Sequence, residues 1–398
     1  MATTFAESAT TTSNHLRHAG TSAGLNAIAG GIGFAPVKAE IVALDRSQIA
    51  DPAPVGGPLQ PGVTVLIPAY NEEASIADTI RSVLTQTSPA AEIIVIDDCS
   101  KDRTAEIARA LGIRVVRPAA NAGSKARALN YGLQFVSCEL VLAIDADTSL
   151  APDAIEKLLP AMKDPGTGAA SGFVLPRHVN TMWERGRYIE YLYAFAFYKP
   201  IQDFYRKPLI ASGCFAVYRT AEIRPMGGWP ERTVGEDMDL TWMTYQQGRV
   251  VRYAPDAVCY PIEPHTYDFM QKQLTRWSHG FVQCLRVHKR TLWEIPHLRM
   301  FVAVALWDAM VAALSFFVLI PLLAIFVHPA FLLGYLIDLP GIIFPVLLQA
   351  ASRGEVFKAI KCIPAFYVLR FVNFYFMIKA FFDELVMNKP LRTFVKGH

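Results

Sequence analysis

The C-terminal part of the chain limits the available folds most strongly, because residues 301–383 are far more apolar and aromatic than residues 62–260. The run from Met300 to Val327 contains one acid, Asp308, and is long enough to span a bilayer. Hydrophobic residues make up 52% of the chain, and the excess over a soluble enzyme is concentrated here. Two further candidates follow: Phe331 to Ala351, interrupted by Asp338-Leu339-Pro340-Gly341, and Cys362 to Phe382, which carries Arg370, Asn373 and Lys379.

The distribution of basic residues predicts how these segments are oriented. Lys and Arg precede the first and third segments, whereas the His328-Pro329 link has neither. Positive loops stay cytoplasmic, so we expect a multi-pass protein of the cell inner membrane with residues before the spans and loop 352–361 in the cytoplasm. Three spans are favoured; alternatively, the third segment lies along the interface as a basic amphipathic helix. The basic residues before the first segment are Lys289, Arg290 and Arg299, and those between the second and third are Arg353, Lys358 and Lys361. A last group follows the third segment and argues mildly against three full crossings: Lys389, Arg392 and Lys396.

The chain divides into three parts by composition. Residues 1–60 are interpreted as an N-terminal arm, partly disordered, without a signal peptide. A linker from Pro52 to Pro61 leads to residues 61–285, expected to be a cytoplasmic catalytic domain. Residues 286–398 form the interface and membrane region. The net charge of +3 gives no reason to expect nucleic acid as a partner, and six cysteines without a CxxC pair are typical of reduced thiols.

Short apolar runs alternate with helical patterns between residues 63 and 147. Strands are predicted at Val63–Pro68, Glu92–Ile96, Arg114–Val116 and Leu140–Ile144, with amphipathic helical segments between them. This alternation is typical of an α/β fold with a parallel sheet, in which ligands bind at the carboxyl ends of the strands. Two acidic clusters follow such strand ends, so we expect them to point into one crevice: Asp97-Asp98 and Asp145-Ala146-Asp147.

The Asp145-Ala146-Asp147 cluster is a DxD sequence after a very apolar strand. Two close carboxylates repel each other unless a cation lies between them, and a divalent metal there would act as a Lewis acid for a leaving diphosphate. Many DxD sequences are only surface turns. Asp97 and Asp98 contact a base or ribose in one interpretation, and in the other they cap the following helix, as Ser100 or Asp102 also could.

Two further motifs have both a functional and a structural interpretation. Lys125 begins a helix after a glycine turn, a position that favours phosphate, although it could equally be a solvated lysine. Gly235-Glu236-Asp237 precedes a helix from Met238 to Gln246. An acid there either caps the helix or, in a cleft, serves as a general base that accepts a proton from a sugar hydroxyl.

The most informative short stretch is Gln273-Leu274-Thr275-Arg276-Trp277. On a helix, Gln273, Arg276 and Trp277 share one face, which combines an amide, a guanidinium suited to phosphate and an indole suited to a sugar ring. The stretch lies about 25 residues before the first span. The alternative is an amphipathic interface helix anchored by its Trp.

Together these motifs resemble the membrane-bound processive members of glycosyltransferase family 2, which include cellulose, chitin, hyaluronan and poly-N-acetylglucosamine synthases. The resemblance extends from about Val63 to Trp277, and the membrane part agrees in placement. It implies an α/β, GT-A-like nucleotide-sugar-binding domain with a mostly parallel sheet and helices on both faces, followed by C-terminal transmembrane helices. It also implies an inverting hexosyltransferase that uses a UDP-sugar donor, a glycan acceptor, and Mg²⁺ or Mn²⁺.

The resemblance implies roles for individual residues. In the family, the nucleotide pocket is lined by residues that match Pro68, Ala69, Tyr70 and Glu72, and the uracil is held by Asp98 with Asp97. The diphosphate is approached by Lys125, and nucleotide and metal are handled by Asp145 and Asp147. The catalytic base is Asp237, beside Glu236; the acceptor is bound by Ser212, Gly213 and Cys214; and the diphosphate and the acceptor sugar are bound by Gln273, Arg276 and Trp277.

Two departures from the family pattern affect the expected function. Gly235 replaces the Thr of a TED motif, which leaves the acid pair intact. The N-terminal spans of many relatives are missing, and three spans look too few to shield a polar glycan from membrane lipid. Export of the product would therefore need a homo-oligomer or an export partner, or does not occur.

The resemblance leaves three functions to compare. The stretch from Ser212 to Trp277 weakly favours UDP-GlcNAc over UDP-glucose as the donor. The alternative enzyme is a polyprenyl-phosphate sugar synthase that transfers a single sugar to a lipid carrier, and the QxxRW motif argues against it. A non-catalytic membrane scaffold is the remote alternative.

Overall fold

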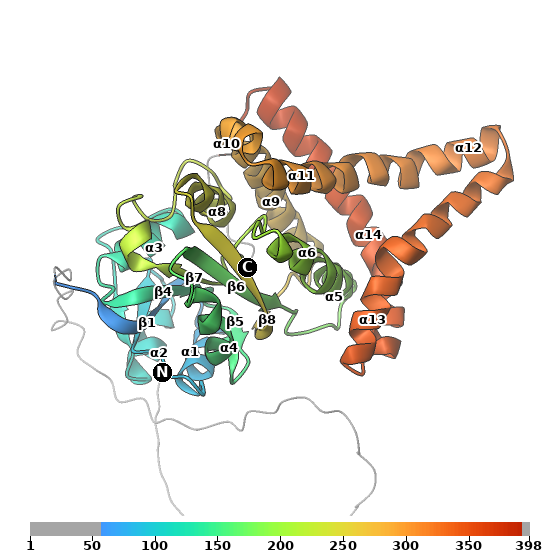
Figure 1. The fold of residues 1–398 in the computed structure, drawn as a ribbon. Helices are drawn as coiled ribbons and strands as arrows, with labels where there is room; N and C mark the ends of the chain where they lie inside the picture. Colours follow the sequence, from blue (N-terminus) through green and yellow to red (C-terminus); the bar gives the residue numbers. More distant parts are fainter. Residues whose placement is uncertain (1–56, 392–398) are drawn as a thin grey trace, which may run out of the picture. The chain divides into compact units, whose positions relative to one another are not determined.

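A mixed eight-stranded sheet forms the centre of the computed structural model, which describes residues 57–391 (Figure 1). The strand order is β3-β2-β1-β4-β7-β6-β8-β5. The β3–β2, β2–β1, β1–β4 and β6–β8 pairs are parallel and the others are antiparallel. The strands are β1 Gln60–Ala69, β2 Glu92–Asp97, β3 Arg114–Val116, β4 Cys138–Ile144, β5 Thr148–Leu150, β6 Thr167–Val174, β7 Phe215–Arg219 and β8 Val250–Pro261.

The expected arm falls mostly outside the described residues, as do Arg392 and Lys396 of the predicted C-terminal basic group. β1 begins at Gln60, inside the stretch expected to be a linker. The four strands predicted from the sequence are all present as β1 to β4. Because β1, β2 and β4 run parallel, the acidic residues that follow β2 and β4 lie at the same edge of the sheet, as expected.

Helices cover both faces of the sheet because residues of β1 alternate between two cores. Val65 and Ile67 pack in one core with Ile80 of α1, whereas Leu66 packs in the other with Leu129 of α3. The expectation of an α/β domain with helices on both faces of its sheet is therefore correct. The helices of this part are α1 Ile76–Leu84, α2 Thr104–Ala110, α3 Lys125–Leu133, α4 Ala154–Leu158, α5 Met182–Tyr193, α6 Lys199–Phe204, α7 Thr220–Ile223, α8 Glu236–Gln246 and α9 Tyr267–Val287.

Three C-terminal helices are long and apolar enough to cross a membrane: Pro296–Phe326, Pro329–Ser352 and Val356–Val386. The first contains α11 Pro296–Leu306 and α12 Ile320–Phe326, with π-helical turns between them, and follows the short α10 Lys289–Glu294. The second ends in α13 Phe344–Ser352, and the third begins with α14 Val356–Phe381.

The expected interruption of the second segment at Asp338–Gly341 is wrong. The helical path changes there from 3-10 to π geometry and continues, because Pro340 falls in the first turn of the new segment, where its missing N–H costs little. Asp338 is also satisfied, since its carboxylate accepts a 2.7 Å hydrogen bond from Arg370 of α14. Arg370 donates a second bond, of 3.0 Å, to Asp308, so one cation links all three apolar helices.

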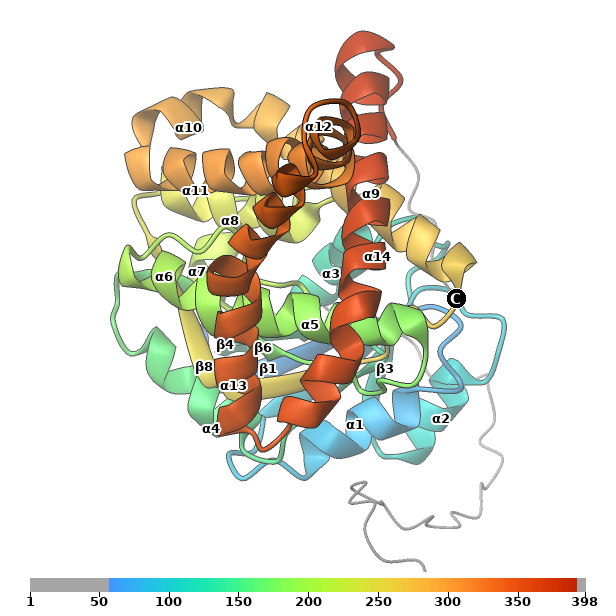
Figure 2. The ribbon, with the colours of Figure 1, turned by 90° about the vertical axis from the view of Figure 1, so that its right-hand side faces the viewer.

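The apolar helices are packed against the sheet domain through α5. Figure 2 shows α13 and α14 lying across this helix. Gly186 of α5 permits the close approach: a Cβ there would lie 3.0 Å from the carbonyl oxygen of Ala365 and from Cβ of Leu369, both on α14. The same helix therefore contacts α14 and, as described below, the catalytic cavity.

Candidate active site

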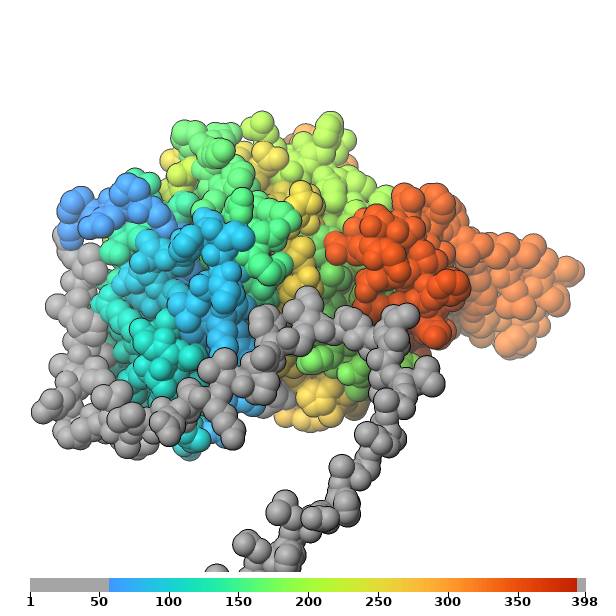
Figure 3. Space-filling view, turned by 90° about the horizontal axis from the view of Figure 1, so that it is seen from below, coloured from blue at the N-terminus to red at the C-terminus, as the bar shows by residue number. Residues whose placement is uncertain are grey.

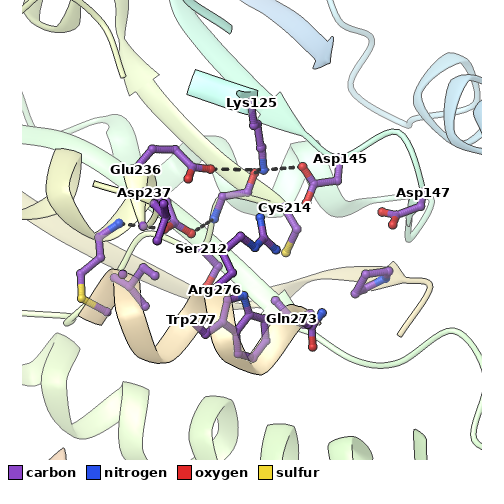
Figure 4. Close-up of a pocket in the computed structure, with 18 of the residues that line it drawn as sticks. Lys125, Asp145, Asp147, Ser212, Cys214, Glu236, Asp237, Gln273, Arg276 and Trp277 are labelled. Atoms are coloured by element: carbon purple, nitrogen blue, oxygen red, sulfur yellow. Dashed lines mark hydrogen bonds and ion pairs between the residues drawn. The ribbon is translucent and has the colours of Figure 1, made fainter. Parts of the chain in front are cut away.

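A cavity of about 610 Å³ opens at the carboxyl ends of β1, β2 and β4. Almost every residue that the sequence analysis singled out lines it. These residues are Pro68, Ala69, Tyr70, Glu72, Asp98, Lys125, Asp145, Asp147, Ser212, Gly213, Cys214, Glu236, Asp237, Gln273, Arg276 and Trp277. They come from both halves of the sheet domain and from α9 (Figure 4).

Asp97 does not line the cavity. Its side chain is fully buried, accepts a 2.8 Å hydrogen bond from Arg117 and accepts another, of 3.0 Å, from the backbone amide of Ser100. It therefore holds the turn after β2 but does not cap α2, because the amide of Thr104 donates to Asp102 instead, at 3.0 Å. Asp98 does face the cavity and accepts a 2.6 Å hydrogen bond from the amide of Ala122. Burial raises the pKa of the Asp98 carboxyl.

Lys125 lies between two carboxylates at the centre of the cavity. Its ammonium group forms an ion pair with Asp145, lies 3.9 Å from Oε1 of Glu236, and donates a 3.1 Å hydrogen bond to the carbonyl oxygen of Gly213 (Figure 4). Burial opposes this charge, but Asp145 and Glu236 hold the pKa of Lys125 above the ordinary lysine value. The lysine is therefore a permanent cation that faces the cavity, and such a cation can bind phosphate oxygens.

The Ser212–Cys214 segment joins the carboxylates to a second buried lysine. The amide of Gly213 donates to Oδ2 of Asp237 at 2.9 Å. Lys199, at the start of α6, donates to the hydroxyls of Ser212 at 3.0 Å and Ser171 at 3.1 Å. Burial lowers the pKa of Lys199 to about 8.

The predicted face of α9 forms the opposite wall of the cavity. Gln273, Arg276 and Trp277 all line it, and in Figure 4 Arg276 points toward Cys214. Arg187 of α5 supports this face from behind. Its guanidinium lies 4.4 Å from the centre of the Trp277 ring and donates a 2.7 Å hydrogen bond to Oε1 of Gln273. Arg187 is fully buried.

Sequence reasoning missed Arg187 and three cavity residues: Tyr191, Lys199 and Glu263. Glu263 is 4% exposed; its Oε1 accepts a 2.7 Å hydrogen bond from the Tyr191 hydroxyl, while its Oε2 is buried and has no hydrogen-bond partner within residues 57–391. Burial raises the pKa of Glu263. The sequence offered one signal for Arg187: it lies three residues before Glu190, a spacing at which an Arg and a Glu pair on one helix.

Asp145 and Asp147 offer the donor atoms that Mg²⁺ or Mn²⁺ prefers. Both carboxylates follow β4 and line the cavity, and Thr148 donates a 3.3 Å hydrogen bond to Oδ1 of Asp147. The described part of the chain contains no group of three or more His, Cys, Asp or Glu side chains placed to hold a metal. Two carboxylates fit a hard cation that takes its other ligands from a diphosphate and water.

Residues 64–224 match Glycosyl transferase family 2. The matched part contains most of β1, all of β2 to β7 and the DxD sequence. The resemblance drawn from the motifs is confirmed, and so is the prediction of an enzyme.

Two of the matching relatives with curated names are polysaccharide synthases. The chain is 31% identical over 224 residues to the poly-beta-1,6-N-acetyl-D-glucosamine synthase of Staphylococcus epidermidis, a match that covers 55% of this chain and 54% of that protein. The same figures hold for the enzyme of that name from Staphylococcus aureus strain COL. The match thus spans about half the length of these relatives.

A solved structure shares the fold over most of the chain. It is a mannosyltransferase from Pyrobaculum calidifontis in complex with GDP-Man and Mn²⁺, with a TM-score of 0.56 and 20% identity. The likeness covers 86% of this chain and 91% of that one. It supports the GT-A-like fold.

Proposed function

We propose that this chain is an inverting, metal-dependent glycosyltransferase that adds a sugar from a UDP-sugar to a growing β-linked polysaccharide or oligosaccharide. The observation that carries the proposal is a single cavity in a glycosyl transferase family 2 domain that combines Asp237, Lys125 and the Gln273–Arg276–Trp277 face. UDP-GlcNAc is the favoured donor, because the similar staphylococcal proteins are named as N-acetyl-D-glucosamine polymer synthases.

In the proposed mechanism, Asp237 accepts the proton of an acceptor hydroxyl. The acceptor oxygen attacks the anomeric carbon as the bond to the nucleoside diphosphate breaks, and this single displacement inverts the configuration. Lys125 and Arg276 stabilise the charge that develops on the diphosphate. Asp145 and Asp147 would hold Mg²⁺ or Mn²⁺, which supplies further Lewis-acid stabilisation of the leaving group.

The remaining residues bind the two substrates. Asp98 holds the base of the donor at the end of β2, next to the Pro68–Tyr70 segment and Glu72. Trp277 supports the acceptor ring, and Ser212, Gly213 and Cys214 lie beside it. Arg187 positions Trp277 and Gln273 from outside the cavity.

We further propose that residues 61–285 act at the cytoplasmic face of the cell inner membrane and that residues 286–398 form the membrane part. The three long apolar helices support this orientation, together with the basic residues before the first segment and between the second and third segments. Export of a glycan would require a homo-oligomer or a partner protein, since three helices enclose too little space for a polar chain.

A polyprenyl-phosphate sugar synthase is the second candidate. Lys199 favours it, because a buried ammonium group beside Ser212 would suit an acidic acceptor. The exposed indole of Trp277 on the cavity wall favours a sugar acceptor instead.

The test is product analysis with membranes that contain the full chain, Mg²⁺ or Mn²⁺, and a panel of UDP-GlcNAc, UDP-glucose and GDP-mannose. A ladder of oligosaccharides from one UDP-sugar supports the proposal. A single lipid-linked sugar supports the second candidate. No release of nucleoside diphosphate from any donor would overturn both.

A further inference from the structure

A second pocket lies outside the catalytic cavity, where the beginning of α5 meets the first turns of α14. It has a volume of about 510 Å³ and is lined by Val179, Arg185, Lys358, Lys361 and Cys362. Figure 3 views the structure from the side of the α13–α14 junction, drawn in orange-red, which immediately precedes these turns. None of these residues belongs to the proposed catalytic machinery.

The pocket carries an excess of positive charge. Among the described residues, no carboxylate pairs with Arg185 or Lys361, whereas Lys358 forms a 2.8 Å ion pair with Glu355 and lies 4.5 Å from the centre of the Tyr188 ring. Three cations, Arg185, Lys358 and Lys361, therefore line the pocket, and Glu355 compensates the charge of Lys358 alone. Such a site is electrostatically complementary to a phosphate group.

Exposed apolar side chains lie on the same turns as the residues that line the pocket. α14 begins at Val356, so the pocket lies at the N-terminal end of the third apolar helix. Phe357 is 83% exposed and Ile360 is 48% exposed on the same turns, and Met182 is exposed at the start of α5. Basic groups next to exposed aromatic and aliphatic groups are typical of the boundary between headgroups and acyl chains.

We propose that this pocket binds the phosphate headgroup of an anionic phospholipid, with an acyl chain lying along Phe357 and Ile360. The inference rests on the membrane insertion of the three apolar helices that the proposed function includes. A soluble phosphate would use the three cations but would leave the apolar groups exposed, so the observations favour the lipid over a free anion.

The position of the pocket links the lipid to the catalytic cavity through α5. Arg185 faces the pocket, while Arg187, two residues further along, is buried on the other side of the helix, against Trp277 and Gln273. Gly186 between them is packed tightly on α14. A headgroup that fixes the start of α5 against α14 would therefore also fix the support of the acceptor wall.

The experiment measures lipid retention and does not depend on activity. The full-length protein is placed in bilayer nanodiscs of phosphatidylcholine with a minor fraction of phosphatidylglycerol, and the lipids that stay bound after extraction are counted by native mass spectrometry. The test variant is R185Q/K361Q. The matched control is K289Q/R290Q, which removes two basic residues before the first apolar helix, where Arg290 is exposed.

We expect selective retention of phosphatidylglycerol by the wild-type protein and by the control, and an affinity about 30-fold weaker in the test variant, since each interfacial cation contributes about 1 kcal/mol. Equal retention in all three proteins would overturn the proposal. Displacement of the lipid by millimolar glycerol phosphate would also overturn it, in favour of a soluble anion. An inactive enzyme that still retains the lipid would contradict the proposed function alone.

Discussion

The backbone amide of Gly213 donates a 2.9 Å hydrogen bond to Oδ2 of Asp237, so the segment proposed to bind the acceptor is attached to the carboxylate proposed as its base. The carbonyl of the same glycine accepts a 3.1 Å bond from Lys125. One residue therefore connects the group that would receive the acceptor proton to the cation that would stabilise the leaving diphosphate. A Cβ at position 213 would be in tight contact with both side chains.

Replacing Gly213 with Ala should lower kcat while donor binding changes less. A Cβ would lie 3.0 Å from Oδ2 of Asp237 and 3.2 Å from Nζ of Lys125, so one of these groups must move. A displacement of about 1 Å of a catalytic group costs on the order of 10²-fold in rate, which is the upper limit of the loss expected here. Steady-state kinetics and donor titration on the variant measure the two effects. Gly57→Ala, at a glycine with open space around it, is the control, and equal kcat in both variants would contradict the positioning role.

Replacing Asp237 with Asn should reduce turnover by about 10²- to 10⁴-fold and leave donor affinity unchanged. The amide side chain can still accept the bond from Gly213 but cannot take a proton, and loss of general-base catalysis has that magnitude. Nucleoside diphosphate release measures turnover, and calorimetry measures binding. Glu236→Gln is the comparison, because Glu236 lies next to the proposed base and faces Lys125 at 3.9 Å. Full activity in the Asp237 variant would refute its assignment.

The site residues that follow parallel strands were predicted from the sequence better than the site residues that come from later parts of the chain, for physical reasons. Asp98, Lys125 and Asp145 follow parallel strands, and period-2 and helical patterns are enough to place such residues at one sheet edge. Asp97 shows the limit of this reasoning. Adjacent residues at a strand end point in opposite directions, and which one faces the cavity depends on Arg117, whose contact is not local in sequence.

The residues that sequence reasoning missed depend on tertiary packing. Lys199 at the start of α6 and Glu263 just after β8 are buried polar residues, far apart in the sequence, that line the same cavity. Similarly, the Asp338-Leu339-Pro340-Gly341 stretch looks like a helix breaker, yet the helix Pro329–Ser352 continues through it. Asp338 pairs there with Arg370, which is 32 residues later in the chain and lies in the next helix. Such pairings cannot be read from local patterns.

Replacing Glu263 with Gln should weaken acceptor binding by about 10-fold, because it removes the carboxylate that pairs with buried Arg187 behind the acceptor wall. Oε2 of Glu263 is buried 3.7 Å from Nε of Arg187, the residue that supports Trp277 and Gln273, so loss of the negative charge weakens the support of the acceptor wall. The Michaelis constant for an added oligosaccharide acceptor measures the effect, and donor hydrolysis without acceptor should stay constant. Tyr191→Phe removes the bond to Oε1 and keeps the carboxylate, so a smaller change is expected there. An unchanged acceptor constant in the Glu263 variant would exclude this role.

The pH dependence of activity should reveal the charge of Lys199. Burial lowers the pKa of its ammonium group to about 8, while Cys214, Asp237, Cys259 and Asp203 partly offset this effect. Lys199 is therefore a cation below about pH 8 and loses a proton above it. As a cation it donates to both Ser171 and Ser212, which fixes the segment that holds Asp237.

We accordingly expect kcat/KM of the wild-type enzyme to fall as the pH rises through about 8. Lys199→Arg should keep its activity up to a higher pH, because a guanidinium stays protonated over this range. Lys199→Met should be less active at every pH and should lack the inflection, since it has no charge to lose. Initial rates between pH 6 and 9.5, with enzyme stability checked at each value, provide the measurement. If the Arg variant keeps the wild-type inflection, a group other than Lys199 titrates, and the wild-type profile then reports on that group.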